Sequence, residues 1–310
     1  MSQADPWSEH DGSLSIIIDP WIIPCLCALA LLASYNPWGP GTHVQLANRI
    51  LEEAPSRLPS APTSKIIEYP RHFIYGNIAA DVINFKSYGG LRNHCHNWNM
   101  EERLGAHATS DQQQAFIQGY LCHLAADTVA HGHFVPFHLL NSAPPPILGH
   151  TYWEARADSP VSEENWLVLD DLRKDRTLRK EDLLIQAAVP TQALSMGTNR
   201  WIFDHVLLAR SRKSWRVVIK RMRRRKPAGQ IDESEHRACL DLALERMRWV
   251  FSDRHHLALR QFDPTGDKAL KTARGLKRQL VLEHGSRASA SKRCQRQAVR
   301  RFSAKKKRSR

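Results

Sequence analysis

The sequence has few cysteines, and they form no recognisable metal-binding or disulfide pattern. Six cysteines are spread over 310 residues, and no Cys-x-x-Cys pair occurs. This spacing excludes a disulfide framework and a cysteine-based zinc finger. Cys95 and Cys122 are therefore expected to be small buried side chains, as free cysteines usually are.

Long hydrophobic runs are also missing. The apolar run over residues 21–33 is too short to cross a bilayer as a helix, which takes about 20 residues. Its length matches the central part of a signal peptide, but residues 1–19 contain no lysine or arginine and four acidic residues. Length thus favours export and charge favours a buried N-terminal helix. Between these we prefer an exported or membrane-associated protein to a cytoplasmic one.

The chain lacks long stretches of alternating polar and apolar residues, which are typical of β-strands. Apolar residues instead recur at helical spacing, most clearly over residues 110–131, where Ser110 or Asp111 can cap the helix. The sequence therefore predicts an all-α, multi-helix fold. Further helices are expected over residues 43–54, 71–85, 147–157 and 231–262, and residues 160–210 show a helical pattern that Pro190 divides.

Composition divides the chain into four parts. Residues 1–35 form an N-terminal segment with the short apolar run, and residues 36–210 form the main helical domain. Residues 211–284 are a basic helical region. Residues 285–310 consist mainly of Ser, Ala, Lys and Arg, which predicts a disordered basic tail.

Basic residues are scarce in the first 200 positions and abundant afterwards. Residues 1–200 contain 14 Lys and Arg against 21 Asp and Glu, whereas residues 201–310 contain 31 against 10. The acidic part suits a cation site, and the basic part suits a phosphate-bearing partner, either a phospholipid membrane surface or a nucleic acid. Residues 212–226 are the most basic segment, either a solvated helix face or an amphipathic helix on a membrane.

Histidines and carboxylates gather in the acidic part, where ten of the 16 histidines lie between residues 43 and 150. His123 and Asp127 are four residues apart on the helix over 110–131, so both can reach one metal ion. His150 and Glu154 repeat this spacing on the short helix over 147–157.

Other potential ligands lie on neighbouring segments: His43, Asp81, His94, His96, His131 and His133. Imidazole suits zinc, and a carboxylate can bridge two ions. Roughly eight ligands exceed what one tetrahedral ion needs, so the set predicts a multinuclear zinc site. His72, His107 and His138 are expected to be surface or core residues, because no carboxylate lies at helical spacing on the same face.

The motifs WGPGTH, IAAD, HCHNW, GYLCHLAADTVAH and GHTYWE, found in this order over residues 36–157, resemble the zinc-dependent phospholipase C family. The better-known members bind three zinc ions in an all-α domain, a fold shared with related single-strand nucleases. The resemblance implies that Asp127 is a bridging ligand. The further ligands that it implies are His43, Asp81, His123, His150 and Glu154. To these it adds one of His94 and His96, and one of His131 and His133.

Some assignments stay open within this resemblance. His96 is preferred to His94 because an aromatic residue follows closely. His131 lies at the helical spacing from Asp127, whereas His133 matches the spacing of the secreted bacterial enzymes. Those enzymes also bind zinc through the amino group of an N-terminal Trp, whereas Trp38 is internal here. Two or three zinc ions are therefore expected.

The predicted activity is phosphodiester hydrolysis of the phospholipase C type, which releases diacylglycerol and a phosphorylated head group. Zinc would activate the attacking water, and Asp81 is the candidate catalytic general base. One alternative is a single-strand nuclease, with Trp98, Tyr152 and Trp153 as candidates for base stacking. The other is a non-catalytic binding module that metal ions stabilise.

Overall fold

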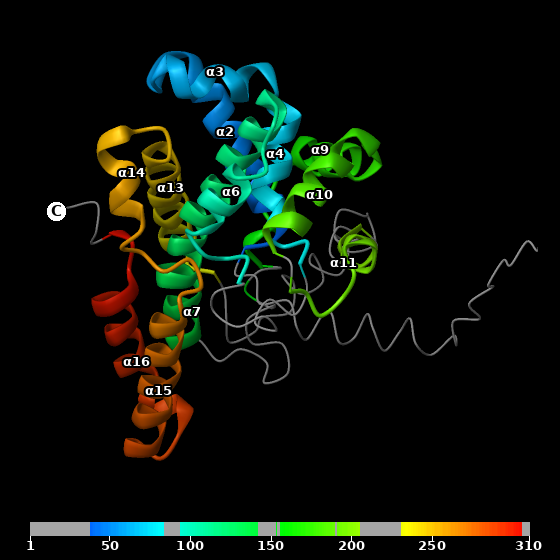
Figure 1. Cartoon of the computed structure of the whole chain (residues 1–310). Helices are drawn as coiled ribbons and strands as arrows, with labels where there is room; N and C mark the ends of the chain where they lie inside the picture. Colours follow the sequence, from blue (N-terminus) through cyan, green and yellow to red (C-terminus); the bar gives the residue numbers. More distant parts are fainter. Residues whose placement is uncertain are drawn as a thin grey trace, which may run out of the picture.

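The computed structural model describes residues 38–83, 94–141, 153, 156–189, 191–204 and 231–305. Every regular element in these ranges is a helix, which confirms the predicted all-α class (Figure 1). None of these helices has the length and apolar character needed to cross a membrane. The apolar run over residues 21–33 and the basic segment over residues 212–226 lie outside the described residues.

Helix α6 (Asp111–Val129) is the central helix of the main core. Ser110 caps it, since its hydroxyl accepts a hydrogen bond from the backbone N–H of Gln113, as the sequence predicts. From residue 115 onward almost every side chain of α6 is buried, which is typical of a helix surrounded by others. The helices that pack against it are α2 (Pro40–Arg57), α3 (Ser60–Glu68), α4 (Pro70–Ala79), α5 (Met100–Gly105) and α13 (Glu233–Trp249).

Two glycines allow α4 and α6 to approach closely. A Cβ atom at Gly76 would collide with the backbone carbonyl oxygen of Phe116, and one at Gly119 would collide with that of Phe73. The contact therefore excludes any larger residue at either position. Asp81 follows α4 directly, so this close packing brings it near the polar side chains of α6.

The helical conformation continues beyond the end of α6. A π-helical turn, η2 (Ala130–Phe134), follows at once and leads into α7 (Val135–Asn141). The regular α-helix does end before Pro136, but the chain stays helical through it. Pro136 lies in the first turn of α7, where a missing backbone N–H costs little.

Helices α9 (Glu163–Lys174), η3 (Arg176–Leu178), α10 (Arg179–Ala188) and α11 (Met196–Ile202) follow, and α14 (Asp253–Leu259) comes after α13. The proline-rich residues 55–64 are mostly helical in α2 and α3. Helix α2 begins at Pro40, a residue favoured at the first helical position, so Thr42 lies in its first turn.

The described part of the chain ends with a hairpin of α15 (Asp267–Glu283) and α16 (Arg287–Phe302), which packs along α7 (Figure 1). The prediction of a disordered tail from residue 285 is wrong for residues 287–302. The buried side chains of α16 recur every four residues and form a narrow stripe, which a bulk composition dominated by basic residues conceals. They are Ala290, Cys294, Ala298 and Phe302.

Candidate metal centre

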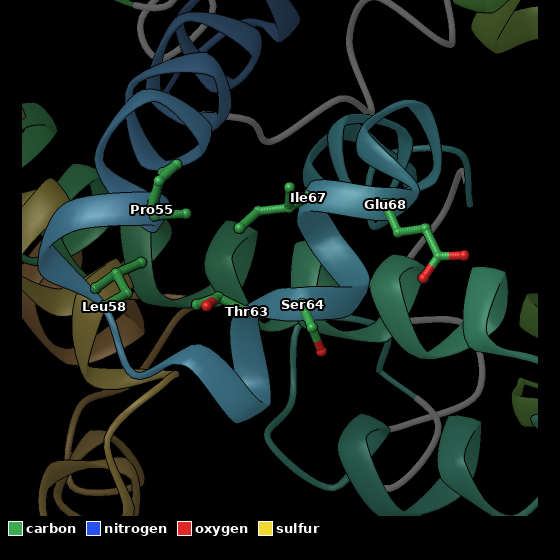
Figure 2. Close-up of a pocket in the computed structure, with 7 residues that line it drawn as sticks. Pro55, Leu58, Thr63, Ser64, Ile67 and Glu68 are labelled. Carbon is green, nitrogen blue, oxygen red and sulfur yellow. The ribbon is translucent and has the colours of Figure 1, made fainter.

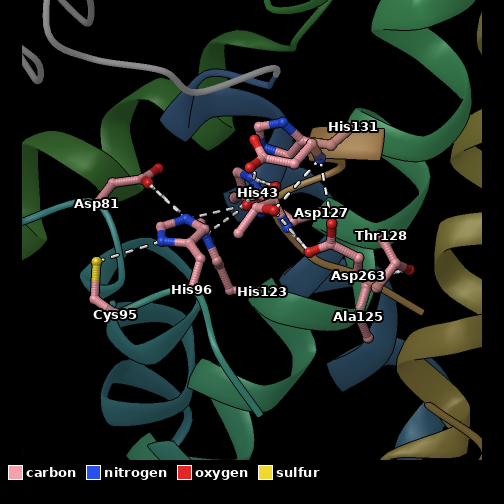
Figure 3. A network of polar contacts seen from close by, with 12 residues as sticks. His43, Asp81, Cys95, His96, His123, Ala125, Asp127, Thr128, His131 and Asp263 are labelled. Carbon is pink, nitrogen blue, oxygen red and sulfur yellow. Dashed lines mark hydrogen bonds and ion pairs between the residues drawn. The ribbon is translucent and has the colours of Figure 1, made fainter. Parts of the chain in front are cut away.

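Six of the predicted side chains converge in the main core (Figure 3). They come from α2, the turn after α4, the segment before α5, α6 and η2. All are buried, none with more than 5% of its surface exposed: His43, Asp81, His96, His123, Asp127 and His131.

Asp127 lies at the centre of this cluster. Its Oδ2 atom is 3.1 Å from Nε2 of His96, 3.2 Å from Nε2 of His123 and 3.6 Å from Nε2 of His131. Its Oδ1 atom is 3.4 Å from Nε2 of His43. The two carboxylate oxygens thus face different imidazoles, an arrangement that suits a carboxylate shared between two cations.

Asp81 adds a second carboxylate. Its Oδ1 atom is 3.3 Å from Nε2 of His96 and 3.8 Å from Nε2 of His123. Two overlapping groups have ligand atoms that all lie within 4.8 Å of one another: His43, Asp81 and His123, and His96, His123 and Asp127. His123 belongs to both groups.

The imidazole nitrogens and carboxylate oxygens of the cluster are arranged better for binding a cation than for binding one another. The Nε2 atoms of His96 and His123 are only 3.1 Å apart, and the rings of His43 and His123 stack with centroids 4.1 Å apart. Among the described residues neither ring nitrogen of His43 has a hydrogen-bond partner. Buried polar atoms without partners are costly, and a zinc ion among imidazoles and carboxylates would satisfy them.

Electrostatics favour the protonation states that bind metal. Burial lowers the pKa of His123, although Asp127 and Asp81 act in the opposite direction. Burial alone would raise the pKa of Asp127, but the imidazoles of His123, His131 and His43 together outweigh it and hold that pKa well below its usual range. A neutral imidazole and an ionised carboxylate are the forms that coordinate a cation.

Outer contacts orient two of the imidazoles. Nδ1 of His123 lies 2.7 Å from the backbone carbonyl oxygen of Asn77, so this nitrogen carries the proton and Nε2 presents its lone pair to the cluster. Nδ1 of His96 lies 3.4 Å from the sulfur of Cys95. Such second contacts are typical of metal-binding histidines.

The π-helical turn separates the two histidines that the sequence left as alternatives. His131 faces Asp127. His133 instead faces α16, where its Nδ1 atom lies 3.0 Å from the carbonyl oxygen of Phe302. The other pair also separates: His96 joins the cluster, while Nδ1 of His94 accepts a hydrogen bond from the backbone N–H of His96. His94 forms a further group of potential ligands with Cys95 and His96.

His150, Tyr152 and Glu154 lie outside the described residues. Trp38 is buried beside the cluster, with its ring centroid 6.4 Å from that of His43. Trp98 is also buried, and its indole N–H donates to the carbonyl oxygen of Phe262.

Sequence reasoning missed two supports of the cluster. Asp158 is buried and accepts hydrogen bonds from the backbone N–H and the hydroxyl of Thr42, which fixes the start of α2 next to His43. Gly266 has a φ of +61° and packs directly on the backbone of His131, and Figure 3 shows Asp263 beside the His131 ring. The Pro-Thr-Gly sequence that follows Asp263 signals a turn, but not which residue the turn contacts.

A separate hollow of about 410 Å³ lies between α2 and α3 (Figure 2). Its lining contains neither histidine nor cysteine and consists of Ala54, Pro55, Leu58, Thr63, Ser64, Ile67 and Glu68. This lining offers one carboxylate and no imidazole, so it does not resemble a zinc site.

Comparison with known proteins gives one match. A family model described as zinc dependent phospholipase C matches residues 42–245, more than half of the chain. The matched range includes all six clustered side chains and ends before α14, α15 and α16. No curated protein and no solved structure shows significant similarity to the chain.

Proposed function

The chain belongs to the zinc-dependent phospholipase C family and is a phosphodiester hydrolase, and we propose that the buried cluster around Asp127 is its metal centre and active site. The observation that carries the proposal is the position of Asp127. Both of its oxygens face buried imidazoles, and among the described residues the ring nitrogens of one of these, His43, have no hydrogen-bond partner.

We assign the ligand roles to the six clustered side chains and add His150 and Glu154 from their motif. Bound zinc supplies Lewis-acid chemistry, because it activates water near neutral pH and stabilises negative charge on a phosphate group. The chain's own residues hold the geometry. The carbonyl oxygen of Asn77 fixes the ring of His123, and Asp158 fixes the helix that carries His43.

Asp81 is the proposed general base. It is one of two carboxylates in the cluster, and it contacts fewer imidazoles than Asp127 does. With one of its oxygens on a metal ion, Asp81 would accept the proton of an attacking water on the other oxygen. We expect Asp81→Asn to lower kcat more than it lowers zinc content.

A phospholipid is the substrate that fits best. A nuclease active on single strands needs exposed aromatic rings for base stacking. Trp98 and Trp153 are buried instead, and the ring of Trp153 stacks on His138 with centroids 4.7 Å apart. Two of the three aromatic candidates for a nuclease thus belong to the core.

The test measures head-group release from phosphatidylcholine vesicles. We expect release of diacylglycerol and a phosphorylated head group, its loss on chelation and its recovery on addition of zinc. Asp127→Asn should abolish release, and elemental analysis of the wild-type chain should give two or three zinc ions. Single-stranded DNA should not be cleaved at a comparable rate. Turnover that survives complete metal removal would contradict the proposal.

A further inference from the structure

The hairpin of α15 and α16 is the most basic region that the structure describes. Residues 267–305 contain 12 Lys and Arg but only two acidic residues. Helix α16 has no acidic residue, and within the described part of the chain its basic side chains form no ion pair. All six are exposed: Arg287, Lys292, Arg293, Arg296, Arg300 and Arg301.

Three of these basic side chains form a row along one face of α16. Lys292, Arg296 and Arg300 lie four residues apart on α16, so they share one exposed face. Like charges at this spacing destabilise a helix. The buried contacts of α16 with α7 and α15 hold the row together against that repulsion, and an anionic partner would relieve it.

Both ends of the hairpin adjoin the segment that carries His131 and His133. At the start of α15, Gly266 packs on the backbone of His131. At the end of α16, the carbonyl oxygen of Phe302 lies 3.0 Å from Nδ1 of His133. A surface that binds the hairpin is thereby held at a defined position relative to the metal centre.

Exposed apolar side chains accompany the charge. Leu282 is 74% exposed near the tip of the hairpin, and Val299 is 39% exposed on α16. A basic surface with protruding apolar side chains is typical of helices that lie at a membrane interface. The aromatic rings on which nucleic-acid bases stack are missing, because Phe302 is the only Phe, Tyr or Trp in residues 267–305 and it is buried.

We propose that the α15–α16 hairpin is a docking surface for anionic phospholipid bilayers, which places the metal centre at the membrane. The hairpin lies beyond the residues that match the family model. The docking surface is thus an addition of this chain to the matched domain. Its binding to lipid does not depend on whether the metal centre is assembled.

The test is sedimentation of the full-length chain with vesicles, in a chelator so that hydrolysis plays no part. We expect binding to vesicles that contain phosphatidylserine, little binding to pure phosphatidylcholine, and weakening with salt. The triple variant Lys292→Glu, Arg296→Glu, Arg300→Glu should bind anionic vesicles at least about tenfold more weakly.

A matched control reverses three exposed charges on η3 and α10, namely Arg176→Glu, Arg179→Glu and Lys180→Glu. This control should bind vesicles within about twofold of the wild-type chain, because these positions lie outside the hairpin. An equal loss in both variants would show a net-charge effect and overturn the proposal. No loss in the hairpin variant would also overturn it.

Two further measurements keep the result interpretable. Replacing the same three hairpin residues by Gln removes the repulsion without new charge, so the fold is retained and the weaker binding should persist. A single-stranded oligonucleotide serves as the rival ligand. If it binds the hairpin and anionic vesicles do not, the docking surface is not for lipid.

Discussion

The metal-centre region and the C-terminal hairpin place their charged groups in opposite ways. Around α6, carboxylates and imidazoles are buried in the main core within a few ångströms of one another. In α15 and α16, most basic side chains lie in solvent above a small second core that includes Ala273, Ala290 and Ala298. Polar groups in the first region depend on each other and, in the proposed site, on a cation, whereas most of those in the second are solvated. The same kind of substitution should therefore have different consequences in the two regions.

The largest effect is expected at His123, which belongs to both groups of potential ligands. His123→Ala should lower head-group release by at least about 100-fold and reduce the zinc content, since losing even an outer partner of a metal site costs 10–100-fold. Assays of vesicle hydrolysis and elemental analysis on the same preparation measure both. The matched comparison is Lys292→Ala on the hairpin, which should leave the zinc content unchanged. Full zinc occupancy in His123→Ala would show that His123 is not a zinc ligand.

Acid should destabilise the junction between the two regions, where His138 of α7 and His236 of α13 pack on Phe134. Burial lowers the pKa of His138 to about 3 and that of His236 to about 4. In the unfolded chain both titrate near 6.5, so the unfolded state binds more protons between these values. Stability should be complete above about pH 6.5 and fall by on the order of 3 kcal/mol for each histidine as the pH approaches 4.

Denaturant unfolding of the metal-free chain at several pH values measures this slope. Metal-free protein is needed because acid also releases zinc. His138→Phe keeps a ring on Trp153 but cannot be protonated, so its stability should depend less steeply on pH. An unchanged slope in this variant would show that His138 is not a source of the acid sensitivity.

A methyl group at the contact between α4 and α6 should destabilise the metal-centre region. Gly119→Ala would place its Cβ against the carbonyl oxygen of Phe73 and force the two helices apart. We expect a loss of about 1–3 kcal/mol, as for other overpacked cores, together with weaker zinc binding as Asp81 moves away from α6. Urea unfolding and a zinc titration test this. Wild-type stability would show that the helices can separate without cost.

The same substitution in the hairpin should have a small effect of opposite sign. Gly275 lies on the exposed side of α15, and a Cβ atom there meets no atom within 4 Å. Gly275→Ala should stabilise α15 by about 1 kcal/mol, because alanine is the better helix former. Amide hydrogen exchange in α15 provides the measurement. Faster exchange in the variant would show that residue 275 has no free space for a Cβ atom.

The sequence alone predicted those features of the site that depend on spacing along a single helix. The helix over residues 110–131 and its Ser110 cap follow from spacing along one helix, and both are confirmed. Spacing on that helix also places His123 and Asp127 on one face. Whether these side chains bind zinc stays a prediction.

The hairpin shows where composition fails. Its basic residues dominate the local sequence, and only four buried side chains of α16 reveal that it packs on other helices. The stripe contributes little apolar area by itself. Its partners on α7 are far away in the sequence, so its burial becomes visible only when the chain has folded.

The sequence by itself determined the helical class, the family motifs and the pairing of His123 with Asp127, because helix periodicity acts over a few residues. Only the tertiary structure decided which alternative histidines share the cluster. The π-helical turn directs His131 toward Asp127 and leaves His133 against α16. The packing of α4 on α6 brings Asp81 near His96 and His123, the imidazoles that also face Asp127. These outcomes depend on close contacts between segments distant in the sequence, which no local spacing encodes.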